Sequence, residues 1–162
     1  MKETSKTRGN ITELETAAAL VRRNCGICIP YGDRSRYDLV ADVDGKFLRI
    51  QCKSSHTADG GRSFSFKTCS VNYVDGKRAH VGYSPEDVDY FATVFNNKCY
   101  LYPVTDESMM LKTLRIEPTV NGQSSGITWA KDYTIDVVLS RIRGKMIREQ
   151  HRRDKEANSN KG

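Results

Sequence analysis

The chain has 162 residues, with 26 Lys and Arg against 20 Asp and Glu, a net charge of +6 and 38% hydrophobic residues. This length is typical of one domain of roughly 100–200 residues, and the hydrophobic share is sufficient for a packed core. The longest apolar run, residues 17–21, is far shorter than the ~20 residues of a membrane helix. We therefore expect one globular domain that has a cytoplasmic location and no membrane partner.

Cysteine usage and charge distribution narrow the class further. Five cysteines, an odd number, are awkward for a disulfide framework and ordinary in a reducing compartment. Residues 141–162 carry eight basic and three acidic side chains, so +5 of the net +6 lies in the last 22 residues. Such a cluster is typical of a protein that binds nucleic acid, and a solubilising terminus explains it equally well.

The first expected element is a helix that begins near Asn10, a favourable N-cap residue. The apolar residues that recur at helical spacing, and that we expect to be buried, are Ile11, Leu14, Ala17, Ala18 and Val21. Glu13 lies at the edge of this stripe. Its carboxylate either closes a capping box on Asn10 or is compensated by a metal, a cation or backbone donors.

A hairpin follows, because two strand-like runs, residues 37–43 and 46–53, are joined by Asp44-Gly45. With these two residues as the loop, Asp38 faces Gln51, and Lys53 is a diagonal neighbour on the same face. The opposite face collects the apolar residues Tyr37, Leu39, Ala41, Val43, Leu48, Ile50 and Cys52. The face with the acid, the carboxamide and the amine is either solvent-exposed or a functional site.

Further elements follow from turn signals and periodicity. Strands are expected at residues 26–30 and 62–68, and a second hairpin at residues 92–95 and 99–104. We expect a polar loop at residues 54–61, an exposed basic turn at 72–80, and short helices from Ser84 and at residues 109–114. The last helix begins near Tyr133, with the apolar stripe Ile135, Val138, Leu139, Ile142 and Met146. Residues 1–147 then form the domain, and residues 148–162 a basic, partly disordered extension.

The order of these polar residues resembles the PD-(D/E)xK nuclease superfamily. The resemblance is carried by Glu13 on the first helix, Tyr37-Asp38 at the start of one strand and Gln51-Cys52-Lys53 at the end of the next. More narrowly, the chain is similar to group I intron-encoded homing endonucleases in which glutamine replaces the acid of the motif. The resemblance covers most of residues 9–104. It implies an α/β fold of the restriction-endonuclease type, with a central mixed sheet, a core hairpin, and an N-terminal and a C-terminal helix on its flanks.

The resemblance also implies catalytic roles for Glu13, Asp38, Gln51 and Lys53. Asp38 would be the central ligand of Mg²⁺, with Mn²⁺ as a substitute, and Gln51 and the backbone carbonyl of Cys52 would complete the protein contacts. Lys53 would orient the attacking water and stabilise developing charge. Glu13 would add a second carboxylate. Because Gln51 carries no negative charge, the number and affinity of the metal ions stay open.

The function implied is metal-dependent hydrolysis of double-stranded DNA, most specifically by a homing endonuclease acting as a homodimer or homotetramer. The alternatives are a Holliday-junction resolvase, a restriction or repair nuclease, or a catalytically inactive DNA-binding module, which Gln51 would favour. A zinc site at Cys25-x-x-Cys28 lacks a second matching pair. The expected DNA-binding residues are Arg62, Lys67, Lys77, Arg78, Arg141, Arg143, Lys145 and Arg148.

Overall fold

The computed structural model describes residues 4–32, 34–105, 108–120, 122 and 125–159 of the chain. Its helices are α1 (Ser5–Val21) and α2 (Ile135–Ser159), with short 3₁₀ turns η1 (Asp59–Gly61) and η2 (Ala130–Tyr133). The strands are β1 (Gly26–Cys28), β2 (Leu39–Val43), β3 (Lys46–Cys52), β4 (Ser55–Ala58), β5 (Ser63–Lys67), β6 (Cys69–Val74), β7 (Lys77–Gly82), β8 (Tyr90–Phe95), β9 (Lys98–Pro103) and β10 (Leu111–Arg115).

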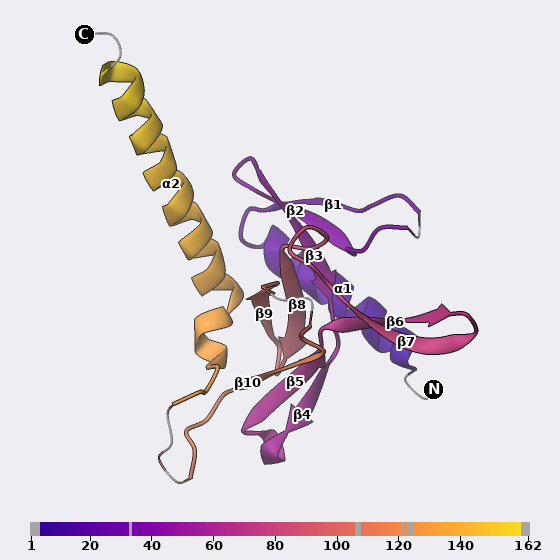
Figure 1. Ribbon diagram of the computed structural model, residues 1–162. Coiled ribbons are helices and arrows are strands. Elements are labelled where there is room, and N and C mark those ends of the chain that lie inside the picture. Colours follow the sequence, from indigo (N-terminus) through magenta and orange to yellow (C-terminus); the bar gives the residue numbers. More distant parts are fainter. Residues whose placement is uncertain (1–3, 33, 106–107, 121, 123–124, 160–162) are drawn as a thin grey trace.

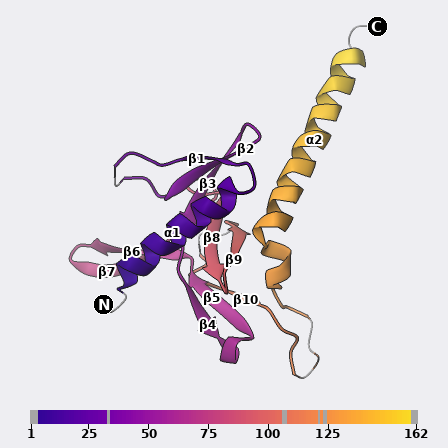
Figure 2. The same cartoon turned by 180° about the vertical axis from the view of Figure 1, so that it is seen from behind.

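A five-stranded sheet in the order β1-β2-β3-β8-β9 forms the centre of the molecule (Figure 1). The β3–β8 pair is parallel and the other pairs are antiparallel, so the sheet is mixed, as expected. A smaller sheet has the order β10-β5-β4, and β6 and β7 form a two-stranded ribbon. One core lies between the central sheet and the helices α1 and α2 (Figure 2), and a second, aromatic core lies against β5 and β10. The expected α/β fold of the restriction-endonuclease type is confirmed.

The predicted hairpin is present as β2 and β3 in the expected register, with Val43 opposite Lys46 and Leu39 opposite Ile50. Asp44 and Gly45 have φ of 53° and 90°, which match a tight two-residue turn of the type that favours Asp-Gly. The expected apolar face is buried from Leu39 to Cys52. Alternation of side chains along the two strands therefore places residues 38, 51 and 53 on the other face, at the open end of the hairpin.

The first helix differs from its prediction in start and in orientation. It begins at Ser5 and is capped by Thr4, whose Oγ1 accepts from the Thr7 N–H at 3.1 Å. Its buried residues are Thr12, Thr16, Ala19 and Leu20, whereas Ile11, Leu14 and Val21 are exposed. Thr12 can face the core because its hydroxyl is satisfied within the helix, where Oγ1 donates to the Arg8 carbonyl at 2.9 Å. Asn10 lies inside the helix, so the capping box between Asn10 and Glu13 is wrong.

Four other local predictions are wrong. Residues 72–80, expected as a basic turn, belong mostly to the paired strands β6 and β7, and the turn itself is only Asp75 and Gly76. Two further predictions fail because pairing with distant strands outweighs the local signal. Residues 55–58 form strand β4 and residues 111–115 form strand β10, because both pair with the buried strand β5. Residues 84–87 form a turn in which Ser84 Oγ donates to Asp87 Oδ2 at 3.1 Å. The turn does not extend into a helix, since Asp89 is held beside β3 by Arg49.

The C-terminal helix α2 docks through the predicted stripe, with Ile135, Val138, Leu139 and Ile142 buried. Beyond residue 147 the helix continues away from the body to Ser159 (Figure 1). Neither of the two helices described is long and apolar enough to cross a membrane.

The contact between Arg49 and Asp89 fixes β8 beside β3. Asp89 Oδ2 accepts from the Arg49 backbone N–H at 2.7 Å and from its guanidinium at 3.1 Å, and Asp89 Oδ1 accepts at 3.0 Å. Although burial opposes ionisation, these hydrogen bonds hold the pKa of Asp89 below its ordinary value. The contact therefore stabilises the fold fully above the ordinary Asp pKa, and this stability is lost as pH falls through the lowered pKa.

We expect Asp89→Asn to lower the free energy of unfolding by about 2 kcal/mol at neutral pH, because it weakens hydrogen bonds to a charged group. Urea unfolding at pH 7 and in the acid range measures this loss, which should shrink toward low pH. The control is Glu156→Gln, whose ion pair with Arg152 on α2 is exposed and should change stability by less than about 0.5 kcal/mol. Equal losses of stability in the two variants would contradict a stabilising role of the Arg49–Asp89 contact.

Candidate active site

The structure brings Asp38, Gln51 and Cys52 together at the open end of the β2–β3 hairpin. Gln51 Nε2 donates to Asp38 Oδ2 at 2.5 Å, and the Cys52 N–H donates to the same oxygen at 2.6 Å. Gln51 Nε2 is also 3.4 Å from the Cys52 carbonyl oxygen. The opposition of residues 38 and 51 that hairpin geometry predicts is therefore present as a direct side-chain contact.

Lys53 lies next to this group and is held from two directions. Its Nζ donates to the Tyr83 hydroxyl at 3.0 Å and to the Cys69 carbonyl at 3.4 Å. The ammonium also lies 4.6 Å from the centre of the Tyr83 ring, a distance at which the ring face attracts a cation. The backbone N–H of Lys53 donates to the Ala92 carbonyl at 2.8 Å. This hydrogen bond fixes the backbone of Lys53 to the central sheet, and its side chain extends from there to the site.

Glu13 faces the same group from helix α1. Glu13 is largely exposed, and its pKa is raised, first by the partial burial of its carboxylate and then by the charge of Asp38. Burial also raises the pKa of Asp38, and hydrogen bonds from Cys52 and Gln51 and the charge of Lys53 offset this only in part. Two neighbouring carboxylates, of which Asp38 is half-buried, repel each other and are stabilised by a cation between them.

The residues present fit a hard divalent cation. The Gln51 NH₂ group lies between Asp38 Oδ2 and the Cys52 carbonyl oxygen, where it donates to both. Rotating this amide by half a turn would place its oxygen where its nitrogen now lies. The carboxylate, amide and carbonyl oxygens then form the kind of ligand set that Mg²⁺ prefers. Among the described residues, no group of three His, Cys, Asp or Glu side chains converges.

Sequence reasoning missed Tyr83, which contacts Lys53, and Arg36, which contacts Tyr83. Tyr83 is 5% exposed, and its ring meets Phe91 edge-on at 5.5 Å. The Arg36 guanidinium lies 4.5 Å from the centre of the Tyr83 ring, pairs with Asp87 at 3.4 Å and donates to the Gly82 carbonyl. No spacing rule connects position 83 with position 53. The only available signal was that Arg36 lies two residues before Asp38.

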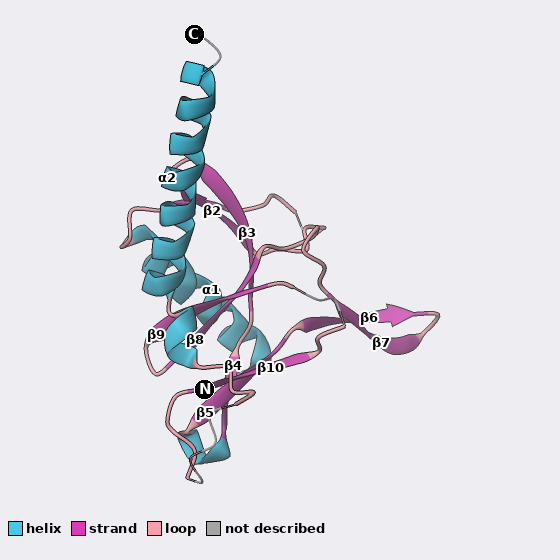
Figure 3. Cartoon of the chain, turned by 60° about the vertical axis from the view of Figure 1, so that its left-hand side comes forward, coloured by secondary structure: helices cyan, strands magenta, loops and turns pink. Residues whose placement is uncertain are grey.

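The expected DNA-binding residues fall into two groups on opposite sides of the molecule (Figures 1 and 3). Lys77 and Arg78 lie on the β6–β7 ribbon, whose first residue contacts Lys53, and Lys67 ends the strand before it. Arg62 lies 4.0 Å from Glu117 in an ion pair. The other group, on α2, is Arg141, Arg143, Lys145 and Arg148.

Several members of the α2 group have intramolecular partners. Arg143 pairs with Asp44 at 2.8 Å and donates to the Arg23 carbonyl at 2.9 Å, so it ties α2 to the hairpin turn. Arg141 donates to the Asp132 carbonyl at 2.7 Å. Lys145 lies 3.8 Å from Glu149. The basic charge that dominates the sequence is thus partly structural and lies away from Asp38 and Lys53.

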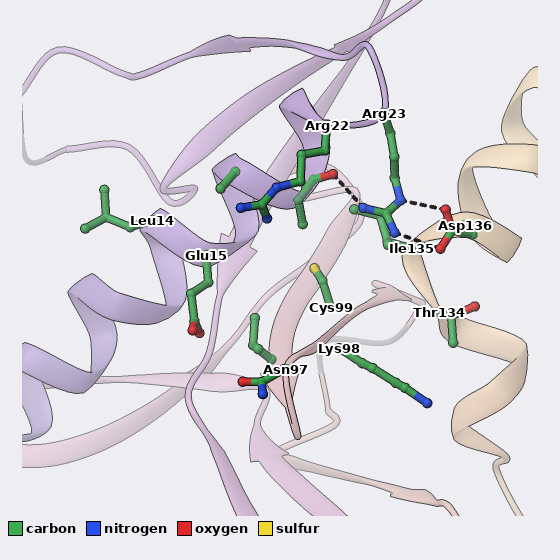
Figure 4. Close-up of a pocket in the computed structure, with 13 residues that line it drawn as sticks. Leu14, Glu15, Arg22, Arg23, Asn97, Lys98, Cys99, Thr134, Ile135 and Asp136 are labelled. Atoms are coloured by element: carbon green, nitrogen blue, oxygen red, sulfur yellow. Dashed lines mark hydrogen bonds and ion pairs between the residues drawn. The ribbon is translucent and has the colours of Figure 1, made fainter.

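A groove of about 720 Å³ lies between α1, the β8–β9 turn and the start of α2 (Figure 4). Arg23, in the turn that follows α1, and Asp136 on α2 form an ion pair there at 2.6 Å. Cys99 on the groove wall is mostly buried, and burial raises its pKa to about 11, so its thiol is protonated at neutral pH. Among the described residues that line the groove, none belongs to the predicted site.

The open site at the end of a sheet hairpin and the mixed sheet define a nuclease-type fold. Residues 3–136 match the family model of the PD-(D/E)XK endonucleases, and this chain belongs to that family. A solved structure with a similar fold is that of the bacterial homing endonuclease I-Ssp6803I. The TM-score is 0.70 at 22% identity, over 89% of this chain and 97% of that one. No curated protein matches the chain.

Proposed function

We propose that this chain is a Mg²⁺-dependent endonuclease that hydrolyses double-stranded DNA at specific sites, as a homing endonuclease does. The observation that carries the proposal is the convergence of Asp38, Gln51 and the Cys52 carbonyl beside the ammonium of Lys53. Membership of the PD-(D/E)XK endonuclease family supports nuclease chemistry at this place. The fold shared with a bacterial homing endonuclease supports the narrower assignment.

In this proposal, Asp38, Gln51 through its oxygen and the Cys52 carbonyl hold Mg²⁺, with Glu13 as the second carboxylate. When bound, the ion supplies Lewis-acid charge and lowers the pKa of a bound water. Burial raises the pKa of Asp38, and a bound cation would lower it again because an adjacent positive charge favours the ionised carboxylate. Lys53 donates hydrogen bonds to the attacked phosphate and to the attacking water, and Tyr83 holds its ammonium in place.

The proposal is tested by one cleavage screen on linear duplex, four-way junction and intron-insertion-site DNA, with Mg²⁺ and with chelator. Metal-dependent double-strand breaks at defined positions in linear duplex support the proposal. Preferential cutting of the junction would instead indicate a resolvase. Salt-sensitive DNA binding without any product would indicate an inactive binding module.

One active site in each chain cuts one strand, so cutting both strands requires at least two copies. We therefore propose a homodimer or homotetramer as the active species. Light scattering of the DNA complex measures its mass, and a complex with a single chain that makes double-strand breaks would contradict the proposal. We further propose that the nuclease domain comprises residues 1–147 and that residues 148–162 are a basic extension.

The glutamine at position 51 leads to a specific expectation for metal affinity. Gln51→Glu should raise Mn²⁺ affinity about tenfold or more, because a negative charge next to a cation is worth over 1.4 kcal/mol even at an effective dielectric constant of about 20. In chelator the variant should be less stable than wild type, because a third carboxylate then adjoins Asp38 and Glu13.

Calorimetric titration of Mn²⁺ into the folded protein measures this affinity. The matched control is Gln150→Glu, which makes the same change of charge at an exposed place on α2. Equal Mn²⁺ affinities for Gln51→Glu, Gln150→Glu and wild type would remove Gln51 from the metal site.

A further inference from the structure

The ribbon formed by β6 and β7, residues 69–82, projects from the body away from both larger sheets (Figures 1 and 3). Its register is continuous from Cys69 opposite Gly82 to Val74 opposite Lys77, and Asp75 and Gly76 form the turn with φ of 49° and 74°. A two-stranded hairpin is marginally stable by itself. A projecting ribbon of this kind is suited to contact a partner.

The side chains of the ribbon differ between its two faces. Tyr73 is opposite Arg78, and Val71 is opposite His80, so these four share one face. Tyr73 is 76% exposed, and Arg78 and His80 are also exposed. Arginine, histidine and tyrosine can all form hydrogen bonds with base edges. This face therefore carries the side chains that can read a base sequence.

Charge favours a polyanion as the partner. Asp75, at the tip, is the only acidic residue among residues 69–82. Lys77 and Arg78 form no ion pair with another described residue. Their charges are thus available to phosphates, unlike that of Arg143, which is paired with Asp44.

The root of the ribbon is fixed to the proposed catalytic centre. Cys69 is the first residue of β6, and Tyr83 directly follows β7. The Cys69 carbonyl and the Tyr83 hydroxyl both accept from Lys53 Nζ. Arg36 adds a hydrogen bond to the Gly82 carbonyl. From this root to the tip, five residue steps at ~3.3 Å extend about 17 Å, which corresponds to about five base pairs at ~3.4 Å each.

We propose that the β6–β7 ribbon lies in the major groove of duplex DNA and reads about five base pairs beside the cleaved phosphate through Tyr73, Arg78 and His80. The inference rests on the proposed DNA-cleaving function. The major groove admits a two-stranded ribbon, and its base edges distinguish all four base pairs. Lys77 contacts a phosphate, which strengthens binding without reading sequence.

Selection of bound sequences from a pool of randomised duplexes, in chelator, tests this inference with the full chain. For Arg78→Ala and Tyr73→Ala we expect discrimination at one or two positions within about five base pairs of the cut to fall roughly tenfold, with other positions unchanged. Lys77→Ala should weaken binding to all sequences alike and reduce the salt slope by about 1. Cleavage of the selected sequences in Mg²⁺ by wild-type protein locates the cut.

The control is Arg22→Ala, which removes one exposed arginine at the end of α1, beside the groove of Figure 4, and should leave the base preference unchanged. Thermal melting verifies that every variant is folded. If Tyr73→Ala does not fold, the base preference of Arg78→Ala alone tests the inference. An unchanged base preference in Arg78→Ala, with wild type binding and cutting DNA, would overturn the ribbon inference and leave the nuclease proposal intact. Wild-type protein that neither binds nor cuts duplex DNA would overturn both.

Discussion

We expect Asp38→Asn to abolish DNA cleavage and to leave the metal-free protein at least as stable as wild type at neutral pH. The loss of cleavage should be about 1,000-fold or more, because a catalytic metal supplies several kcal/mol and each ~1.4 kcal/mol is a factor of ten. The stability follows from burial, which raises the pKa of Asp38 in the folded state. A carboxyl group whose pKa is higher in the folded than in the unfolded state does not destabilise the fold below its ordinary pKa. The free energy of unfolding then decreases as pH rises through the raised pKa.

Thermal melting in chelator between pH 4 and pH 8 measures this effect. The melting temperature of wild type should fall relative to that of Asp38→Asn as pH rises through the raised pKa of Asp38. Mg²⁺ should raise the melting temperature of wild type, because it binds only the folded state, and should not change that of the variant. A variant that melts several degrees below wild type in chelator and keeps the Mg²⁺ response would contradict the assignment of Asp38 as the central ligand.

Lys53→Met should reduce the single-turnover cleavage rate about 10²- to 10⁴-fold and change duplex affinity by less than about threefold. The reduction is of the size expected when a preorganised donor is lost from the attacked group. Methionine keeps the unbranched stem beside Tyr83 without the charge. The affinity should persist, because one phosphate contact among several is a small part of total binding.

Tyr83→Phe is the graded companion of Lys53→Met. It removes the hydroxyl that accepts from Lys53 Nζ and keeps the ring under the ammonium. We expect a roughly tenfold lower cleavage rate with a shifted pH profile, since one hydrogen bond is worth about 1 kcal/mol. Equal losses of duplex affinity and cleavage rate in Lys53→Met would instead indicate that Lys53 only binds a phosphate and has no catalytic role.

The hairpin that builds the site could be predicted because both of its signals are local. Asp44-Gly45 specifies the turn, and strict alternation from Leu39 to Cys52 specifies the buried face, so the contact of Asp38 with Gln51 follows from counting residues. The strand β8 was also predictable from its turn at Asn96 and Asn97, which both have positive φ.

Other features could not be predicted because distant partners determine them. Residues 111–115 are a strand only because β5 offers a free edge, and the hydrogen bond from Lys53 to Tyr83 spans 30 positions. On α1, the buried face contains Thr12 and Thr16 instead of Leu14, because the helix is oriented by its contact with the sheet rather than by its own apolar residues. Charge does not locate the catalytic residues, since the basic α2 lies away from the Asp38 end of the hairpin (Figure 1).

The central claim is that the Asp38 end of the β2–β3 hairpin is a metal-dependent nuclease centre. It is tested most directly by sequencing the ends that purified wild type and Asp38→Asn generate from a pool of random-sequence duplexes, in Mg²⁺ and in chelator. We predict breaks at a defined sequence for wild type in Mg²⁺ and none in the other three reactions. Identical products from Asp38→Asn, or from wild type in chelator, would contradict the claim.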